Sequence, residues 1–318
     1  MNMRKRTRMT PALLLGLCLT LCAAYARQDA ANVITVPSSI DGADQRCEFV
    51  PANKAGDRPL LVFLHPWSHH FDTFDISAWR DEAAARHWHF LAPDFRGPNM
   101  RPEACGSRLA RQDILDAVDC VLARHPVDEN RVYLAGSSGG GHMAMVMAAH
   151  APGRWAAVSA WCGISDLAAW HRETKAAGRK YWKDIEGAVG GAPGASAETD
   201  RALRYRSPVF HLQAARGLPV DFNAGVHDGH TGSVPIHHTI DAFNVVARAR
   251  GDAPVPAEEI DRLSARKGLD KDAEPDPVYG RVIHYRRAAG PSRLTIFEGG
   301  HECIADAACA WLAGHARE

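Results

Sequence analysis

The sequence predicts an α/β fold in which helices cover both faces of a mostly parallel central sheet. Short apolar segments alternate with helical patterns along the chain, as in successive strand–helix units. Residues 60–64 are apolar throughout, which is typical of a strand buried on both faces. Residues 131–150 read as a strand, a glycine- and serine-rich turn and a helix in direct succession. The 318 residues are sufficient for one large domain of this class.

The first half of the chain carries edge strands, inner strands and two helices ahead of that turn. Short apolar segments indicate the strands. Apolar side chains that recur along one side indicate the longer of the two helices. The elements expected, in order, are strands over 33–36, 47–50 and 60–64, a helix over 79–87, a strand over 89–92 and a helix over 107–124.

The second half continues the alternation with two interruptions. Residues 164–217 combine helical patterns with Gly190, Gly191 and Pro193, which indicates a cap-like excursion over the sheet edge. Residues 251–291 are expected to form an insertion that decorates the rim. The other elements expected are strands over 132–135, 156–161 and 220–226, a helix over 233–250, a charged helical patch over 258–267, a loop over 270–277, strands over 281–287 and 293–297, and a closing helix over 304–315.

The turn Gly136-Ser137-Ser138-Gly139-Gly140 carries the strongest chemical signal in the chain. It matches the pattern G-x-S-x-G, with Ser138 at its centre between an apolar strand and an apolar helix. A serine in such a tight turn adopts a strained backbone, and its small neighbours let strand and helix approach closely. The strain holds the hydroxyl where a base can reach it. We therefore predict that Ser138 is a nucleophile; Ser137 would take this role only if Ala135 replaced the first glycine.

A nucleophilic serine needs a base and an acid that orients the base. Asp228 and His301 each come at the end of a predicted strand, and they follow Ser138 in the order acid, then histidine. Since carboxyl ends of parallel strands meet at one sheet edge, the three side chains are expected to lie together. His301 would accept the Ser138 proton, and Asp228 would fix the imidazole tautomer. The rival acids are less suitable, because Asp221 lies inside its strand and Glu302 adjoins the histidine.

An acyl-transfer site also needs two backbone N–H groups directed at the developing oxyanion. One is expected from Gly139, the residue after the nucleophile. The other is expected from the loop after the strand over 60–64. Pro66 in that loop has no N–H group, so Trp67 is the best candidate.

Residues 1–26 have the pattern of a secretory signal peptide. A basic segment precedes an apolar segment that is too short for a membrane span, and Ala24-Tyr25-Ala26 is an A-x-A cleavage site. The alternative is that the segment is not cleaved and stays as an N-terminal membrane anchor. A lipoprotein is disfavoured, because Leu21 stands just before Cys22 where a small residue would be expected. We expect a mature catalytic domain over 27–318 that is periplasmic or secreted and has no stable membrane span.

The charge balance excludes some classes of partner. Lys plus Arg and Asp plus Glu number 37 each, so net charge favours neither a nucleic acid nor an anionic surface. The chain has no C-x-x-C pair that would indicate a zinc ribbon. His227 and His230, which flank Asp228, are expected to be solvated rather than metal ligands. We expect no metal in the site and no cofactor.

Six cysteines follow the predicted cleavage site. An even number in an exported protein suggests disulfides, although sequence alone does not assign the pairs. Cys303 and Cys309 flank a short segment just after His301, and we expect this pair to be a local disulfide. Cys120 and Cys162 fit an alternative as buried thiols. The six are Cys47, Cys105, Cys120, Cys162, Cys303 and Cys309.

Several further segments carry a family resemblance. Together with the Ser138 turn they resemble the α/β-hydrolase superfamily, and within it the prolyl-oligopeptidase-like serine hydrolases and esterases. The segments are Pro93-Asp-Phe-Arg-Gly-Pro-Asn99, Val127-Asp-Glu-Asn-Arg131, Tyr205-Arg-Ser-Pro208, Val234-Pro235 and Glu298-Gly-Gly-His301. The resemblance extends over residues 33–318 and implies the α/β-hydrolase fold.

The chain departs from the family pattern in three respects. It has no N-terminal β-propeller, which favours a single-domain esterase over a peptidase. The loop from Asp228 to Val234 is longer than is usual in the family. The segment between Asp228 and His301 is also long, because residues 251–291 are inserted.

The resulting hypothesis is an exported serine hydrolase that cleaves carboxylic esters, with small-molecule or polysaccharide-linked esters as substrates. An aromatic and histidine-rich rim would contact sugars or would simply pack; its members are Trp67, His69, His70, Phe71, Phe74, Trp161, Trp170, His171 and Trp182. A peptidase acting on short peptides is the alternative, and Arg96, Glu173 or Arg204 would then hold the peptide. A binding protein on a hydrolase scaffold is the alternative of another class.

Overall fold

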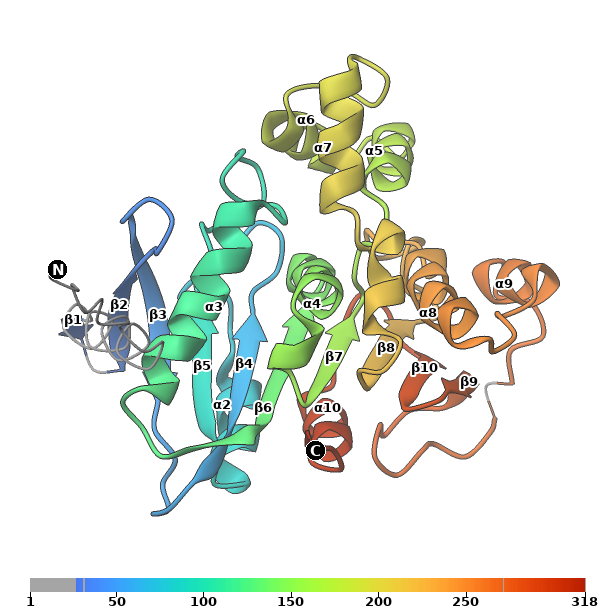
Figure 1. Cartoon of the computed structure of the whole chain (residues 1–318). Coiled ribbons are helices and arrows are strands. Elements are labelled where there is room, and N and C mark those ends of the chain that lie inside the picture. Colours follow the sequence, from blue (N-terminus) through green and yellow to red (C-terminus); the bar gives the residue numbers. More distant parts are fainter. Residues whose placement is uncertain (1–26, 31, 271, 318) are drawn as a thin grey trace, which may run out of the picture.

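The protein is built on one sheet that runs through the whole molecule (Figure 1). The computed structural model describes residues 27–30, 32–270 and 272–317. Within these residues ten strands follow the order β1-β2-β3-β5-β4-β6-β7-β8-β10-β9. The strands are β1 (Arg27–Ala30), β2 (Val33–Pro37), β3 (Asp44–Val50), β4 (Arg58–Leu64), β5 (His89–Pro93), β6 (Val127–Ser137), β7 (Ala157–Trp161), β8 (Val220–Gly225), β9 (Ile283–Ala289) and β10 (Ser292–Phe297).

The centre of the sheet is parallel and its margins are antiparallel. Pairings from β5 through β4, β6, β7 and β8 to β10 are parallel. At the margins, β1, β2, β3 and β5 pair antiparallel in succession, as do β10 and β9. The register sets Gly225 at the end of β8 beside Phe297 at the end of β10. The turns that carry the predicted acid and base therefore leave the sheet side by side.

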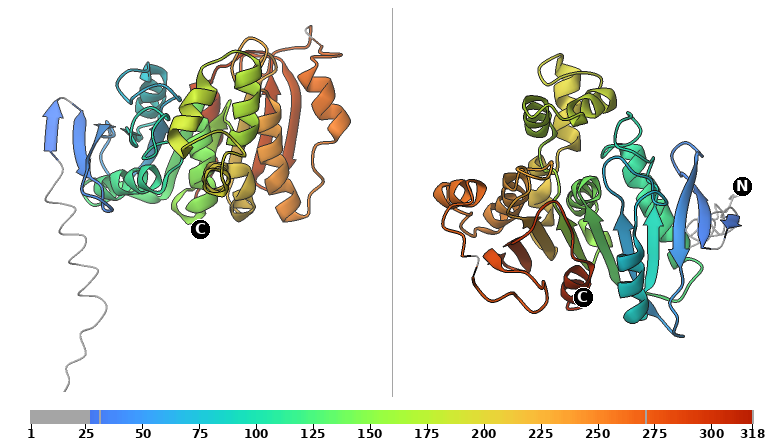
Figure 2. Two further views of the ribbon diagram at one scale, coloured as in Figure 1. Left: turned by 90° about the horizontal axis from the view of Figure 1, so that it is seen from above. Right: turned by 180° about the vertical axis from the view of Figure 1, so that it is seen from behind.

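Helices cover both faces of the sheet. Apolar side chains of α3, α4 and α8 join those of the inner strands in one core cluster, and α2 and α10 form a second cluster on the opposite face. Figure 2 shows α2 and α10 on that face in the view from behind. The helices are α2 (Ser77–Ala85), α3 (Arg108–Leu122), α4 (Gly139–His150), α5 (Leu167–Ala176), α6 (Tyr181–Val189), α7 (Ala197–Arg206), α8 (His237–Arg250), α9 (Ala257–Ser264) and α10 (Ala305–Leu312).

The helices α5, α6 and α7 lie beyond the carboxyl ends of the strands, at the top of Figure 1. They share a small core cluster of their own, to which Trp67 from the loop after β4 also belongs. The three-residue and four-residue 3-10 helices that follow, Pro208–Phe210 and Leu212–Ala215, pack back against α4 and α8. The cap-like excursion thus contacts the loop after β4, at the carboxyl edge of the sheet, through Trp67.

The predicted α/β class and the order of its elements agree with the structure. Several boundaries differ by a few residues. The elbow strand begins at Val127, five residues before the apolar segment, because Val127 pairs with Arg58 of β4 ahead of an irregularity in the register, after which Val132 pairs with Leu60. The strand expected over 281–287, inside the expected rim insertion, forms as β9 over Ile283–Ala289 at the edge of the sheet. Within the insertion, Tyr279 is buried and donates its hydroxyl proton to Asn223 in β8, with an O···O distance of 2.6 Å.

The expected Cys303–Cys309 disulfide is wrong for this structure, in which both residues are free thiols. Cys309 lies on α10 and is buried against the core. Cys303 lies in the loop before that helix and lines a pocket. Proximity in sequence did not bring the two sulfurs together, because a helix begins between them. Cys120 and Cys162 are buried, in agreement with the alternative prediction.

The predicted signal peptide over 1–26 lies outside the described residues. Among the residues that the structure does describe, no helix is both long and apolar enough to span a bilayer.

His142, in the first turn of α4, makes the stability of the fold depend on pH. Its side chain is fully buried, and Nδ1–H donates to the Ile164 carbonyl at 2.8 Å. Burial lowers the pKa of His142 to about 4, because the imidazolium would lose its hydration. The unfolded chain has a histidine pKa of about 6.5, so protonation favours unfolding as pH falls from about 6.5 toward 4. We expect this residue to lower the free energy of unfolding by about 2 kcal/mol between about pH 7 and pH 5.

Urea unfolding of the wild type and of His142→Gln at both pH values checks this expectation. Glutamine can retain the donated hydrogen bond but does not titrate. The loss of unfolding free energy on acidification should therefore be smaller in the variant, and an equal loss in both proteins would contradict the assignment.

Candidate active site

Ser138 lies in the turn between β6 and α4. Its backbone has φ 57° and ψ −113°, and its N–H donates to the Trp161 carbonyl at 2.8 Å. The glycines on either side have no room for a side chain. A Cβ on Gly140 would lie 1.9 Å from the Leu64 carbonyl oxygen. A Cβ on Gly136 would lie 2.2 Å from the Gly140 carbonyl oxygen. This close approach of strand and helix accounts for the positive φ at a serine.

His301 and Asp228 are joined by a hydrogen bond. The distance from His301 Nδ1 to Asp228 Oδ2 is 2.7 Å, and the aspartate is buried. The other carboxylate oxygen, Oδ1, accepts the backbone N–H groups of Gly229 at 2.9 Å and Val234 at 3.1 Å. These bonds fix the carboxylate, and the carboxylate in turn holds a proton on Nδ1 of the histidine. Nε2 is then left as the atom that can accept a proton.

The longer loop between Asp228 and Val234 packs directly on this pair. A Cβ on Gly232 would lie 2.1 Å from Asp228 Oδ1 and 2.6 Å from His301 Cβ, so only glycine fits. The acid turn and the histidine turn are also tied together, because His227 N–H donates to the Gly299 carbonyl at 2.9 Å. The extra loop length is therefore compatible with Asp228 as the acid.

Ser138 and His301 line one pocket of about 440 Å³ at the carboxyl edge of the sheet. Several of its walls are aromatic, and the cap contributes one of them. The lining residues are Pro66, Trp67, Ser68, His69, Phe74, Ser137, Ser138, Tyr181, His301, Glu302 and Cys303. The pocket thus contains two members of the predicted triad, with the third behind the histidine.

Both predicted oxyanion donors lie beside the nucleophile. A Cβ on Gly139 would be 2.4 Å from the backbone nitrogen of Trp67, so the two backbones are in contact. Among the described residues, neither the Gly139 nor the Trp67 N–H group has a hydrogen-bond acceptor. Two adjacent unpaired donors next to a strained serine can bind a developing oxyanion.

Trp170 on α5 links three parts of the site. Its ring meets Trp67 edge-on with centroids 4.8 Å apart and stacks on Tyr181 at 4.9 Å. Its Nε1–H donates to the Ser233 carbonyl, in the loop after Asp228, at 2.8 Å. Trp67 is held by the cap as well, because its Nε1–H donates to Asp184 at 3.3 Å. Trp170 therefore holds three parts of the site in place relative to one another: the loop that carries Trp67, the loop after Asp228, and Tyr181 of the cap.

Trp170→Phe should separate this positioning role from simple packing. Phenylalanine keeps an aromatic ring but leaves the Ser233 carbonyl without its donor, so the acid loop is less firmly held. We expect kcat to fall about tenfold with little change in KM, as for a loss of roughly 1.4 kcal/mol. Steady-state kinetics on a soluble ester measure this. The control is Trp182→Phe, an α6 residue outside the pocket lining, and an equal fall in kcat in both variants would contradict the prediction.

The rival acids are engaged elsewhere. Asp221 is fully buried inside β8, where its carboxylate binds Arg293 Nε at 2.8 Å and Ser159 Oγ at 3.2 Å. Glu302 Oε1 accepts the Gly300 N–H at 3.1 Å. Neither has a hydrogen bond to His301 among the described contacts.

Most of the expected aromatic rim is interior packing. Five of the nine rim residues are buried, namely Trp67, Phe71, Trp161, Trp170 and His171, whereas His69 and Phe74 line the pocket, which Trp67 also borders. The proposed peptide-holding residues also lie outside it. Arg96 binds Asp41 and Asp113, Glu173 binds two histidines, and the Arg204 guanidinium lies 4.2 Å from the Phe210 ring centroid.

Sequence reasoning did not find Tyr181 or the role of Trp170. Both lie in the cap, and their relation to the pocket depends on how α5 and α6 fold over the sheet edge. Trp170 was expected only as a member of the aromatic rim, and Tyr181 was not singled out. No local signal distinguishes a pocket wall from an ordinary core residue in such a segment.

Two clusters of described residues bring possible metal ligands within 4.8 Å of one another: Cys162 with Asp228 and His301, and Glu173 with His237 and His238. In the first, Asp228 and His301 bind each other. Burial raises the pKa of the Cys162 thiol well above its usual range, with the nearby Asp228 contributing, and its Sγ contacts the Glu302 carbonyl at 3.3 Å. This arrangement fits an acid–base pair rather than a metal centre.

Two family profiles match parts of the chain. The prolyl oligopeptidase family matches residues 108–251, and the esterase PHB depolymerase family matches residues 18–172. Both ranges contain Ser138, and the first also contains Asp228. Neither range reaches His301, so the assignment of the base depends on the geometry described above.

One curated relative and two solved structures extend the comparison. Poly(3-hydroxyalkanoate) depolymerase C of Paucimonas lemoignei is 26% identical over 146 residues, which are 43% of this chain and 34% of that protein. This chain therefore spans only about a third of the length of that relative. The acetyl xylan esterase from Paenibacillus sp. R4 matches with a TM-score of 0.58 and 16% identity, over 98% of this chain and 96% of that one. A puromycin-hydrolyzing peptidase of Mycobacterium tuberculosis matches with a TM-score of 0.56 and 17% identity, over 71% of this chain and 34% of that one.

Proposed function

We propose that this chain, a member of the α/β-hydrolase superfamily, is an exported serine hydrolase that cleaves carboxylic esters. The observation that carries the proposal is the hydrogen-bonded Asp228–His301 pair at the pocket that also contains Ser138. The depolymerase family match and the esterase neighbour support ester hydrolysis as the reaction. Export is proposed from the signal-peptide pattern of residues 1–26.

The reaction proceeds through an acyl-enzyme. His301 Nε2 accepts the proton of Ser138 Oγ while that oxygen attacks the ester carbonyl carbon. The carbonyl electron pair moves to oxygen, which receives hydrogen bonds from the Trp67 and Gly139 N–H groups. The imidazolium, stabilised by Asp228, then returns its proton to the departing alcohol oxygen. In the second half of the reaction, His301 takes a proton from water while the water oxygen attacks the carbonyl carbon of the acyl-enzyme. His301 then returns this proton to Ser138 Oγ, and the carboxylic acid leaves.

The pocket favours a neutral acyl group. None of its described lining residues is a lysine or arginine, and Glu302 contributes a carboxylate. A free carboxylate next to the scissile bond would therefore lack a counter-charge. Phe74 and Tyr181 provide partly exposed aromatic surface against which a sugar ring or an alkyl chain can pack. Small neutral acyl groups carried on a polysaccharide or a polyester are the substrates that suit this chemistry.

Hydrolysis of short peptides is the second candidate, and the prolyl oligopeptidase match supports it. A peptidase would need groups that hold the peptide at a fixed distance from the scissile bond. The three residues considered for this task bind elsewhere in the fold. Ester hydrolysis requires no such group, so it is the preferred function.

A fluorophosphonate probe and a substrate panel test the proposal. The panel pairs short-chain nitrophenyl esters with aminoacyl anilides, followed by acetylated xylan and poly(3-hydroxybutyrate). Labelling together with faster ester than anilide cleavage would support the proposal. Faster anilide cleavage would favour the peptidase. Absence of labelling and of turnover would reject the enzymatic function and favour a binding protein.

A further inference from the structure

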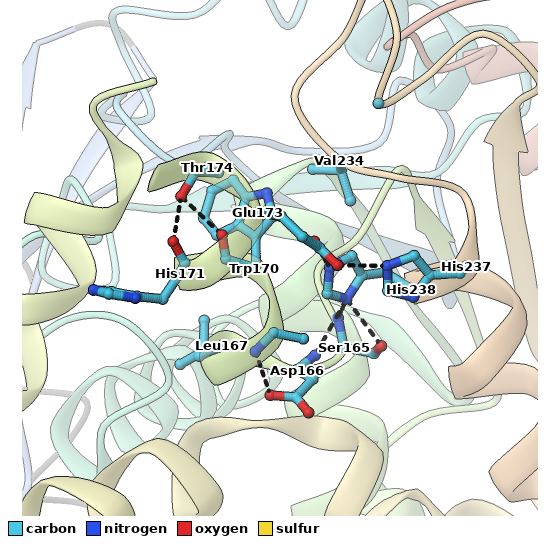
Figure 3. Close-up of polar contacts among 12 residues, drawn as sticks. Ser165, Asp166, Leu167, Trp170, His171, Glu173, Thr174, Val234, His237 and His238 are labelled. Carbon is cyan, nitrogen blue, oxygen red and sulfur yellow. Dashed lines mark hydrogen bonds and ion pairs between the residues drawn. The ribbon is translucent and has the colours of Figure 1, made fainter. Parts of the chain in front are cut away.

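Three side chains of types that can bind a metal ion meet where the cap joins the body of the protein (Figure 3). Glu173 lies on α5, whereas His237 and His238 are the first two residues of α8. Glu173 Oε1 is 2.8 Å from His237 Nε2, and Oε2 is 3.0 Å from His238 Nε2. The two imidazoles stack with centroids 4.4 Å apart, so both direct Nε2 at the same carboxylate.

The donor set and its spacing suit a zinc ion. Two imidazole nitrogens and one carboxylate oxygen form a known zinc ligand set, with a fourth position left for water. Zinc–ligand bonds of about 2.0–2.1 Å place the ligand atoms of a tetrahedral site about 3.3 Å apart. The ligand atoms of Glu173, His237 and His238 already lie within 4.8 Å of one another. Small rotations of the three side chains would therefore bring them to bonding distance.

Each imidazole also has a partner on its other nitrogen. The distance from His237 Nδ1 to Asp241 Oδ2 is 3.0 Å, an arrangement in which a carboxylate orients a metal-bound histidine. His238 Nδ1 accepts the backbone N–H groups of Ser165 and Asp166 at 3.3 and 3.4 Å, and Ser165 Oγ lies 3.3 Å from the same nitrogen. Binding zinc at Nε2 of His238 would displace the proton that now lies between Nε2 and Glu173. With a proton on Nδ1 instead, these two long N–H contacts would be given up and Ser165 Oγ would accept the hydrogen bond.

The cluster is open to solvent on one side. The side chains of Glu173 and His237 are 32% and 30% exposed, whereas that of His238 is fully buried. An ion can thus reach the site from solvent and keep a water ligand while His238 anchors it to the interior. The position also has a structural consequence, because Trp170, one turn before Glu173 on α5, contacts Trp67 and Tyr181 of the pocket.

We propose that Glu173, His237 and His238 form a structural zinc site that fastens the cap to α8. The site is separate from the triad and takes no part in the hydrolytic chemistry. The sequence did not suggest it, since the glutamate and the histidines are more than sixty residues apart and the sequence pattern around His237 is not that of a zinc motif. The proposal does not depend on which bond the enzyme hydrolyses.

Zinc titration of tag-free protein tests the proposal. Protein stripped with a chelator and dialysed is titrated with zinc chloride by calorimetry, and bound metal is counted by elemental analysis. We expect one zinc ion per chain in the wild type and a higher melting temperature with zinc. Substitution of the bound zinc by cobalt should give the visible absorption of a tetrahedral site with nitrogen and oxygen ligands.

Three variants make the test specific. His237→Gln should abolish stoichiometric binding and the zinc-dependent rise in melting temperature. Asp241→Asn, which leaves all three ligands in place, should weaken zinc affinity about 10- to 100-fold, and it covers the case in which His237→Gln does not fold. His230→Gln is the matched control, because the side chain of that exposed histidine bonds only to the Ser264 carbonyl among the described contacts. Absence of stoichiometric zinc in the wild type, or unchanged binding in both site variants, would overturn the proposal.

Discussion

Ser138→Ala is expected to lower kcat/KM for esters by about 10⁵- to 10⁶-fold, as in serine hydrolases whose nucleophile is removed. The attacking oxygen is lost, while the oxyanion donors and the pocket remain. Ser138 Oγ makes no hydrogen bond to the protein among the described contacts, so the melting temperature should barely change. The φ of 57° at this position strains alanine as much as serine. Ester kinetics and thermal unfolding of the same preparation measure both effects.

Ser137→Ala is the matched control for that result. Ser137 also lines the pocket and is the only neighbouring hydroxyl in the turn that sequence reasoning considered as a nucleophile. It ends β6 in register with Trp161, so its backbone belongs to the sheet rather than to the strained turn. Fluorophosphonate labelling should survive this substitution and disappear in Ser138→Ala. The opposite pattern would assign the nucleophile to Ser137.

The sequence predicted the fold well because its signals are local. Apolar strands such as residues 60–64 and the glycine-rich turn around Ser138 each carry their own pattern, and the structure forms both. The superfamily resemblance is confirmed by the family and structural matches. Boundaries were less certain where the register is interrupted, as at the start of β6, where Val127 pairs with Arg58 but the polar residues 128–131 have no partner in β4. The pattern of apolar and polar side chains alone does not reveal which backbone groups form hydrogen bonds.

The site was predictable to the extent that strand ends meet at one edge. Asp228 and His301 are 73 positions apart, yet both follow neighbouring parallel strands, and the structure joins them. The cap offered no comparable rule, because helices packed over an edge do not follow a fixed register. Tyr181 and the Glu173–His237 contact were therefore not foreseen. The Cys303–Cys309 prediction failed for a related reason: closeness along the chain says little once a helix sets the direction of one side chain.

Asp228→Asn is expected to lower kcat about 10⁴-fold while leaving the fold intact, an effect of the size seen when a triad aspartate becomes asparagine. The local hydrogen bonds explain why. Oδ1 accepts two backbone N–H groups, from Gly229 and Val234, so an asparagine would direct its carbonyl oxygen to them. Its NH₂ group would then face His301 Nδ1, where Asp228 Oδ2 now accepts a hydrogen bond at 2.7 Å. The histidine would be forced to carry its proton on Nε2 and would be unable to accept the proton of Ser138.

Asp221→Asn separates this effect from the loss of any buried carboxylate. Asp221 is also buried and lies in the strand that leads to Asp228, but it binds Arg293 and has no described contact with the triad. Its substitution should lower the melting temperature, because Arg293 loses its charged partner, and kcat should remain near the wild-type value. We measure kcat and the melting temperature for both variants. If Asp228 is the acid, Asp228→Asn loses kcat but keeps its melting temperature, whereas Asp221→Asn keeps kcat and has a lower melting temperature. If Asp221→Asn instead lost most of its kcat while Asp228→Asn stayed active, the acid of the triad would be Asp221, inside β8. The loop that follows Asp228 would then have a structural role only.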